Sequence, residues 1–169
     1  MQLQQHQVAS ISRQIAKSLI DAGDIETSNP REVALDVESV LNQYLREEGE
    51  VVQKARDLVQ ERGLSQGEFG RIKRLVADQH GIKVGDDALD HILSQLLSML
   101  MHSNNVDEVF AADHELKRRM RPFLRGGEDE SDKIEAQVRK KLKHVQEGSR
   151  VWEIEYKRMK DEIKRRRGG

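Results

Sequence analysis

Apolar residues recur at the spacing of one helix face through most of this 169-residue chain. The first row is Val8, Ile11, Ile15 and Leu19, whose steps of three and four residues place side chains on one side of an α-helix. Only two prolines interrupt the chain, and alternating β-branched residues are sparse. Ala, Glu, Lys, Leu and Arg are abundant, which is typical of long helices. The sequence therefore predicts an all-α fold.

Glycines and capping residues mark the expected helix ends. A first helix is expected from about residue 3 to residue 22, because Gly23 can adopt the left-handed conformation that ends helices. Ser65 and Glu68 have the spacing of a capping box and predict the start of a short helix. Gly81 predicts its end.

The helix expected over residues 30–62 is predicted to bend or break near Gly49. Its start is marked by Asn29, by Pro30 at the first helical position and by Glu32, which would complete a capping box. Its apolar row lapses around Gly49 and then resumes. The two parts of the row are Val33, Val37, Val40, Leu41 and Tyr44, and Val51, Val52, Ala55, Leu58 and Val59.

The helical plan repeats from Gly85 onward, and this predicts an internal duplication. Val8, Ile11, Ile15, Leu19 and Ile25 match Leu89, Ile92, Leu96, Leu100 and Val106, each 81 positions later. A two-residue insertion is expected around residues 107–115, after which Val33, Val37 and Leu41 match Leu116, Met120 and Leu124. Residues 1–82 and 83–169 are therefore expected to be two tandem helical repeats, packed as an elongated helical bundle.

Three short segments carry a family resemblance. They are residues 148–156, residues 71–74 and the turn at residues 24–26. With the doubled layout, they make the chain resemble the bacterial domain-of-unknown-function family 507, in its two-copy form. The resemblance covers nearly the whole chain and implies an all-helical cytoplasmic bacterial protein. That family has no established activity, so the resemblance implies no catalytic or binding residue.

No sequence motif points to catalysis, a cofactor or a metal. The absence of cysteine excludes a disulfide scaffold, an iron–sulfur cluster, a Cys-ligated zinc site and a thiol nucleophile. There is no HExxH motif, no Gly-rich phosphate loop and no Gly-x-Ser-x-Gly turn. His91, with Asp87 and Asp90 nearby, lacks a third ligand and is interpreted with the other histidines as a surface polar residue. We expect no enzyme activity, no cofactor and no metal site. The histidines are His6, His80, His91, His102, His114 and His144.

Basic residues gather in the second half of an otherwise balanced chain. The whole chain has 29 Lys and Arg against 30 Asp and Glu, which excludes a uniformly basic nucleic-acid-binding protein. Residues 133–169 carry 13 basic and 6 acidic residues. The two sharpest clusters are Lys117, Arg118, Arg119, Arg121 and Arg125, and Lys164, Arg165, Arg166 and Arg167.

These clusters support two interpretations. They can neutralise phosphates and so bind RNA or DNA, with Trp152 and Tyr156 offering a face on which bases stack. Cations near a helix C-terminus also favour the helix dipole, and the two aromatic rings suit packing of the last helix on its neighbours. If nucleic acid is the partner, the two clusters are expected to share one face.

The function expected from the sequence is a non-enzymatic cytoplasmic module for protein–protein interaction or scaffolding. The alternative is an RNA- or DNA-binding accessory protein that uses the basic C-terminal third. No secretory signal is recognisable, and the apolar stretch at residues 89–101 is too short to span a membrane core of about 30 Å. A protein partner or self-association is expected, nucleic acid is open, and a membrane partner is not expected.

Overall fold

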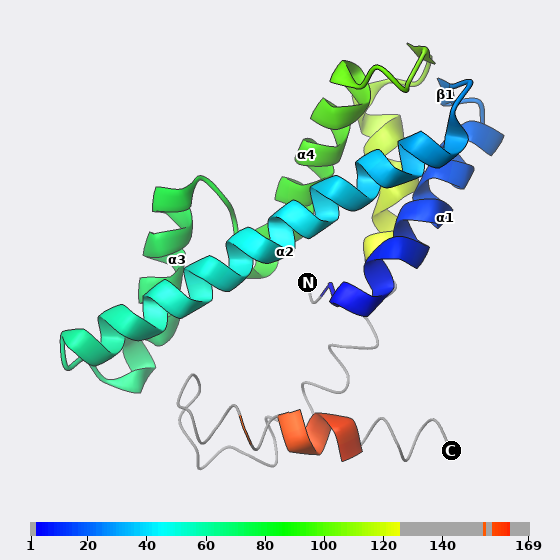
Figure 1. Ribbon diagram of the computed structural model, residues 1–169. Coiled ribbons are helices and arrows are strands. Elements are labelled where there is room, and N and C mark those ends of the chain that lie inside the picture. Colours follow the sequence, from blue (N-terminus) through cyan, green and yellow to red (C-terminus); the bar gives the residue numbers. More distant parts are fainter. Residues whose placement is uncertain (1–2, 126–153, 155–156, 163–169) are drawn as a thin grey trace. The chain divides into compact units, whose positions relative to one another are not determined.

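The computed structural model describes residues 3–125, 154 and 157–162, and helices dominate them (Figure 1). The long helices are α1 (Val8–Asp21), α2 (Pro30–Glu61), α3 (Phe69–His80) and α4 (Ala88–His102). Residues 113–125 form a further helix, called here the 113–125 helix. Short 3-10 turns, Gln5–Gln7, Gln66–Glu68 and Gly85–Asp87, precede α1, α3 and α4. The predicted all-α class is confirmed.

A two-stranded ribbon is the exception to the helical pattern in the described residues. Strand β1 (Ile25–Glu26) pairs antiparallel with β2 (Glu108–Val109), so that Ile25 lies opposite Val109. Each strand follows a helix by a few residues. Two-residue strands leave no alternating pattern to recognise, and the sequence did not predict them.

The chain divides into two compact units. The first comprises Met1–Glu48 and Ile82–Glu128, and the second comprises Gly49–Gly81 and Asp129–Gly169. Each unit therefore takes residues from both of the predicted halves, 1–82 and 83–169. The predicted duplication is a similarity in sequence and helix order between those halves. The division into units does not test that similarity.

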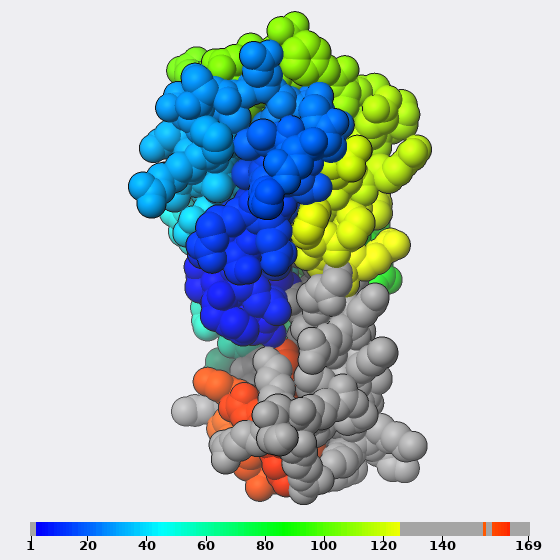
Figure 2. All heavy atoms as spheres, turned by 90° about the vertical axis from the view of Figure 1, so that its right-hand side faces the viewer, coloured from blue at the N-terminus to red at the C-terminus, as the bar shows by residue number. Residues whose placement is uncertain are grey.

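The core of the first unit is built from the predicted apolar rows. Figure 2 shows α1 and the 113–125 helix side by side on one face of this unit. Burial of these rows removes apolar surface from water and is the main stabilising term. The largest fully buried side chains are Val8, Ile15, Leu19, Val33, Leu41, Ile92, Leu93, Leu96, Leu100, Leu116 and Met120. In the second unit, the described buried residues are Val51, Ala55, Val59, Ile72, Val76 and Ala77.

Helix α2 is continuous through Gly49, so the predicted bend or break there is wrong. The buried row resumes in phase, because Tyr44 and Val51 are seven residues, or about two turns, apart. The lapse thus reflects one polar position, Glu48, within an unbroken stripe. Gly49 lies in open space, where a Cβ would meet nothing within 4 Å.

Gly23 ends α1 as predicted. Its φ of +75° lies in the left-handed region. The Gly23 and Asp24 amides donate to the carbonyls of Ile20 and Leu19 at 3.0 Å each, the two bonds of a Schellman motif. This ending turns the chain directly into β1.

The capping box predicted from Ser65 and Glu68 does not form. Ser65 is the N-cap of a 3-10 turn, but its side chain makes no capping hydrogen bond. The Glu68 carboxylate instead accepts a hydrogen bond from Nε of Arg71 at 2.7 Å. The predicted end of this helix is confirmed, because Gly81 has a φ of +75°. None of the described helices combines the length and apolar character needed to cross a membrane.

Candidate binding groove

The predicted basic cluster lies on the 113–125 helix, and most of it is used to hold this helix in the first unit. Arg119 pairs with Asp24, next to β1. Arg121 pairs with Asp90 of α4 at 3.0 Å. These contacts anchor the helix to two other segments of the same unit.

Lys117 and Arg118 differ in their surroundings. Nζ of Lys117 donates to Oγ of Ser94 on α4 at 3.4 Å. Arg118 is exposed, and within the described part of the chain it forms no ion pair. Among the three arginines of the predicted site residues on this helix, Arg118 is thus the one without an ion pair in the described part of the chain.

The other predicted cluster, Lys164, Arg165, Arg166 and Arg167, lies outside the described residues, as do Trp152, Tyr156 and the Gly126–Gly127 pair. The expectation that the two basic clusters share a face stays a prediction. The contacts of Arg119 and Arg121 nevertheless give the first cluster a structural role. They leave fewer cations for phosphates than the sequence suggested.

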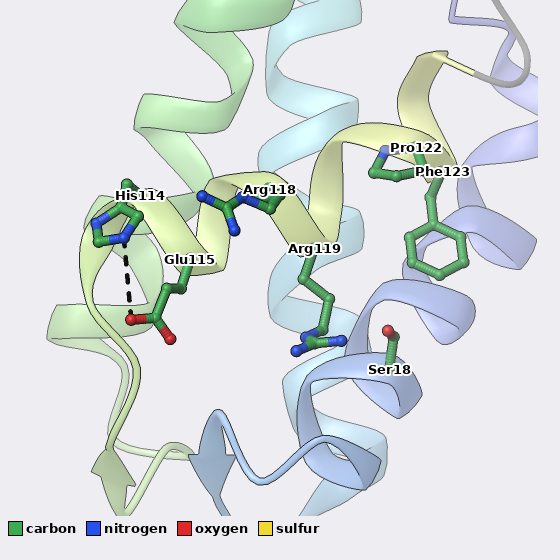
Figure 3. A pocket seen from close by; sticks show the side chains of 7 residues that line it. All are labelled: Ser18, His114, Glu115, Arg118, Arg119, Pro122 and Phe123. Carbon is green, nitrogen blue, oxygen red and sulfur yellow. Dashed lines mark ion pairs between the residues drawn. The ribbon is translucent and has the colours of Figure 1, made fainter.

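An open groove of about 530 Å³ lies between α1 and the 113–125 helix (Figure 3). We call it the arginine groove. Ser18 of α1 lines one side of it. The 113–125 helix supplies the remaining lining residues, His114, Glu115, Arg118, Arg119, Pro122 and Phe123.

The lining of the arginine groove changes in character along its length. Figure 3 shows Arg119 and Phe123 extending from the 113–125 helix toward Ser18. Pro122 and Phe123 make one end apolar. At the other end, Nε2 of His114 lies 3.9 Å from Oε1 of Glu115. Apolar, cationic and acidic groups therefore follow one another within a single groove.

Asp24 fixes the position of Arg119. Its side chain is only 8% exposed, whereas that of Arg119 is 43% exposed. The backbone of Asp24 is itself held, because its carbonyl accepts hydrogen bonds from the amides of Phe110 at 2.9 Å and Ala111 at 3.3 Å. A fixed carboxylate on Nε restrains the guanidinium, and the other N–H donors have no hydrogen-bond partner among the described residues.

A second polar cluster surrounds Tyr44 in the same unit. The Tyr44 hydroxyl has one proton to share between the Lys83 carbonyl at 2.9 Å and a Glu48 carboxylate oxygen at 3.1 Å. Burial raises the pKa of Tyr44 far above its ordinary value, and the charge and hydrogen bond of Glu48 add to this. The hydroxyl stays protonated and acts as a structural donor.

His91 lies beside this cluster. Its ring is tilted against that of Tyr44, with 6.0 Å between ring centroids. Burial lowers the pKa of His91, the Glu47 carboxylate opposes the shift, and Lys83 adds to it. The described part of the chain holds no group of three or more His, Cys, Asp or Glu residues that could bind a metal.

The other histidines are exposed where they are described. They are His6, His80, His102 and His114, while His144 lies outside the described residues. His91 differs from the prediction of a surface residue, because it is half-buried on the apolar side of α4. Its pairing with a buried tyrosine explains this position.

Sequence reasoning missed most of the arginine groove. A signal was present, since 114, 118 and 122 and also 115, 119 and 123 are spaced four residues apart and form adjacent rows on a helix. Ser18 and Asp24 could not be assigned in this way, because they approach the helix only in the folded chain.

A family model described as a protein of unknown function (DUF507) matches residues 1–168. This agrees with the resemblance seen in the sequence and extends over nearly the whole chain. No curated protein matches the chain.

Proposed function

The chain belongs to the DUF507 family, and we propose that it is a non-enzymatic cytoplasmic module that binds another protein. The arginine groove carries this proposal. It is open and lies between two helices, and its walls present arginine and aromatic side chains. These residue types are enriched among the residues that dominate binding energy at protein interfaces.

An exposed aromatic residue adds to the support. Phe110, directly after β2, is 59% exposed. Covering a large exposed apolar ring with a partner removes apolar surface from water, which makes the free energy of association more favourable. Phe110 and the groove both belong to the first unit.

The order of elements supports the proposed duplication of residues 1–82 and 83–169. A 3-10 turn, a helix, a short strand and another helix follow one another in both halves. The strands begin at Ile25 and Glu108, 83 positions apart. The two-residue insertion is therefore better placed before β2 than around residues 107–115. A duplicated scaffold presents similar helix faces twice, which suits interaction rather than chemistry.

The proposal is tested by photocrosslinking in cells of the source organism. A benzoylphenylalanine replaces His114 at the groove, Phe110 near the ribbon or Arg13 on the exposed side of α1, one position per variant. The expected result is a discrete crosslinked protein at His114 or Phe110, identified by mass spectrometry. Arg13 is the matched surface control.

Two results would contradict the proposal. One is the absence of a protein crosslink at both His114 and Phe110 beyond that seen at Arg13. The other is specific turnover in an unbiased substrate screen that a single polar substitution abolishes. Exclusive crosslinking to RNA or DNA would favour the nucleic-acid alternative instead.

A further inference from the structure

We propose that the arginine groove binds an acidic segment of a partner protein, with a carboxylate at Arg118 and Arg119 and an apolar side chain against Phe123. This inference rests on the proposed function and names the chemistry of the partner. It goes further because it assigns a site, a ligand class and the residue on which specificity depends.

Arg119 supplies a prepared set of donors. Its Nε is held by the nearly buried Asp24, yet its side chain remains 43% exposed. A guanidinium has five N–H donors, and this contact uses one of them. Because Asp24 already restrains the side chain, less conformational entropy is lost when a ligand carboxylate binds.

Arg118 supplies the charge. The carboxylate of Asp24 offsets Arg119, whereas Arg118 is exposed and, within the described residues, forms no ion pair. Arginine binds carboxylates through two parallel hydrogen bonds, which gives both affinity and a fixed orientation. Arg118 is therefore the lining residue that we expect to contribute most to the binding of an acidic ligand.

The apolar end explains why a peptide fits better than a free anion. Pro122 and Phe123 line the groove one turn beyond Arg118 and Arg119. A segment with an acidic residue near an apolar one would satisfy both parts of the wall. The Ser18 hydroxyl, across the groove on α1, can bond a peptide backbone group.

The same geometry argues against a polyphosphate chain. Nucleic-acid binding gains its affinity by neutralising several successive phosphates. Here Arg119 and Arg121 are paired within the unit, which leaves few cations for successive phosphates. Within the described residues, the groove thus presents one guanidinium without an ion pair beside an apolar wall, which matches one carboxylate better than a phosphate backbone.

The test begins with a phage-displayed library of random peptides selected on the full chain. Enriched peptides are synthesised with a fluorescent label and titrated by anisotropy. We expect them to combine Asp or Glu with an apolar residue. Arg118→Gln should weaken binding about tenfold, because a charge-assisted pair is lost. Arg125→Gln, which removes the same charge from the same helix outside the groove, should change binding less than about twofold.

Two more variants separate binding from folding. Ser18→Trp should block the groove without changing its charge, and circular dichroism checks that the helices persist. Glu115→Gln should strengthen binding about two- to threefold, because it removes a repelling carboxylate. A gain in affinity cannot arise from a damaged fold.

Equal losses of peptide affinity in Arg118→Gln and Arg125→Gln would overturn the groove proposal. It would also be overturned if no enriched peptide loses its binding in Ser18→Trp. The proposed function would survive either result if the crosslinking at Phe110 still captures a protein. Competition by a single-stranded oligonucleotide with the same dependence on Arg118 would overturn the assignment to an acidic protein segment.

Discussion

Asp24 joins three parts of the first unit through a single residue. Its amide completes the ending of α1, its carbonyl accepts hydrogen bonds from the segment after β2, and its carboxylate pairs with Arg119. The carboxylate is nearly buried, so removing its cation leaves an under-compensated charge. The ion pair therefore stabilises the fold as well as shaping the groove.

Arg119→Gln is expected to lower the free energy of unfolding by about 1–3 kcal/mol. This is below the range for fully buried pairs, because the arginine is half-exposed and solvent screens it. Urea unfolding followed by circular dichroism measures the loss. Asp24→Asn should cost a similar amount, and the double variant should cost about 1 kcal/mol less than the sum. Strict additivity would show that the pair contributes no coupling.

Tyr44 provides a second test at the scale of one atom. Tyr44→Phe removes the hydroxyl that bonds the Lys83 carbonyl and Glu48 while keeping the buried ring. The expected loss of stability is about 1–2 kcal/mol, because the freed acceptors lose a buried donor. Chemical denaturation measures it, with Gln43→Ala on the exposed face of α2 as the control. An unchanged midpoint would mean that water replaces the hydroxyl at no cost.

At the scale of an element, helix α2 shows that the regular spacing of a buried row can outweigh the low helix propensity of a single residue. Gly49 disfavours a helix, but Tyr44 and Val51 on either side belong to the same buried stripe. Packing of that stripe offsets the intrinsic cost of glycine, which is about 1 kcal/mol relative to alanine. The helix therefore continues with an avoidable weakness at its centre.

Gly49→Ala is expected to stabilise the protein by about 0.5–1 kcal/mol, since its added Cβ meets nothing within 4 Å. Thermal unfolding gives the shift. Gly23→Ala is the matched control and should destabilise by about 1–2 kcal/mol, because Gly23 has a φ of +75°. A loss of stability in Gly49→Ala would indicate that this glycine serves a purpose other than helix formation.

Local features of the elements could be predicted, and long-range ones could not. The rows of α1 and α4 and the stops at Gly23 and Gly81 depend on neighbouring residues, and the structure confirms them. Arg119 lies 95 positions from Asp24, so their pairing depends on how the helices pack. The basic cluster was recognised, but the contacts of Lys117, Arg119 and Arg121 were invisible in the sequence. Charge pattern alone cannot show which cations are already paired.

At the scale of the whole molecule, the nearly neutral charge balance makes the environments of individual groups decisive for pH dependence. His91 is the described histidine with a resolved pKa shift, which is downward from 6.5 because of burial. The folded chain thus binds a proton at this site less readily than the unfolded chain. The contribution of neutral His91 to the free energy of unfolding is fully present above about pH 6.5, and it is lost as the pH falls below that value.

Below about pH 7 the unfolded chain binds more protons at His91 than the folded chain does. The free energy of unfolding therefore rises with pH in this range. Between about pH 7 and pH 5.5, the free energy of unfolding should fall as the pH falls, and His91→Gln should make that fall shallower. Urea titrations at a series of pH values measure the slope. Slopes are compared rather than absolute stabilities, because the substitution also removes the ring contact with Tyr44. Exposed His80→Gln is the matched control variant. An unaltered slope in His91→Gln would mean that the imidazole is charged as readily in the folded chain as in the unfolded one.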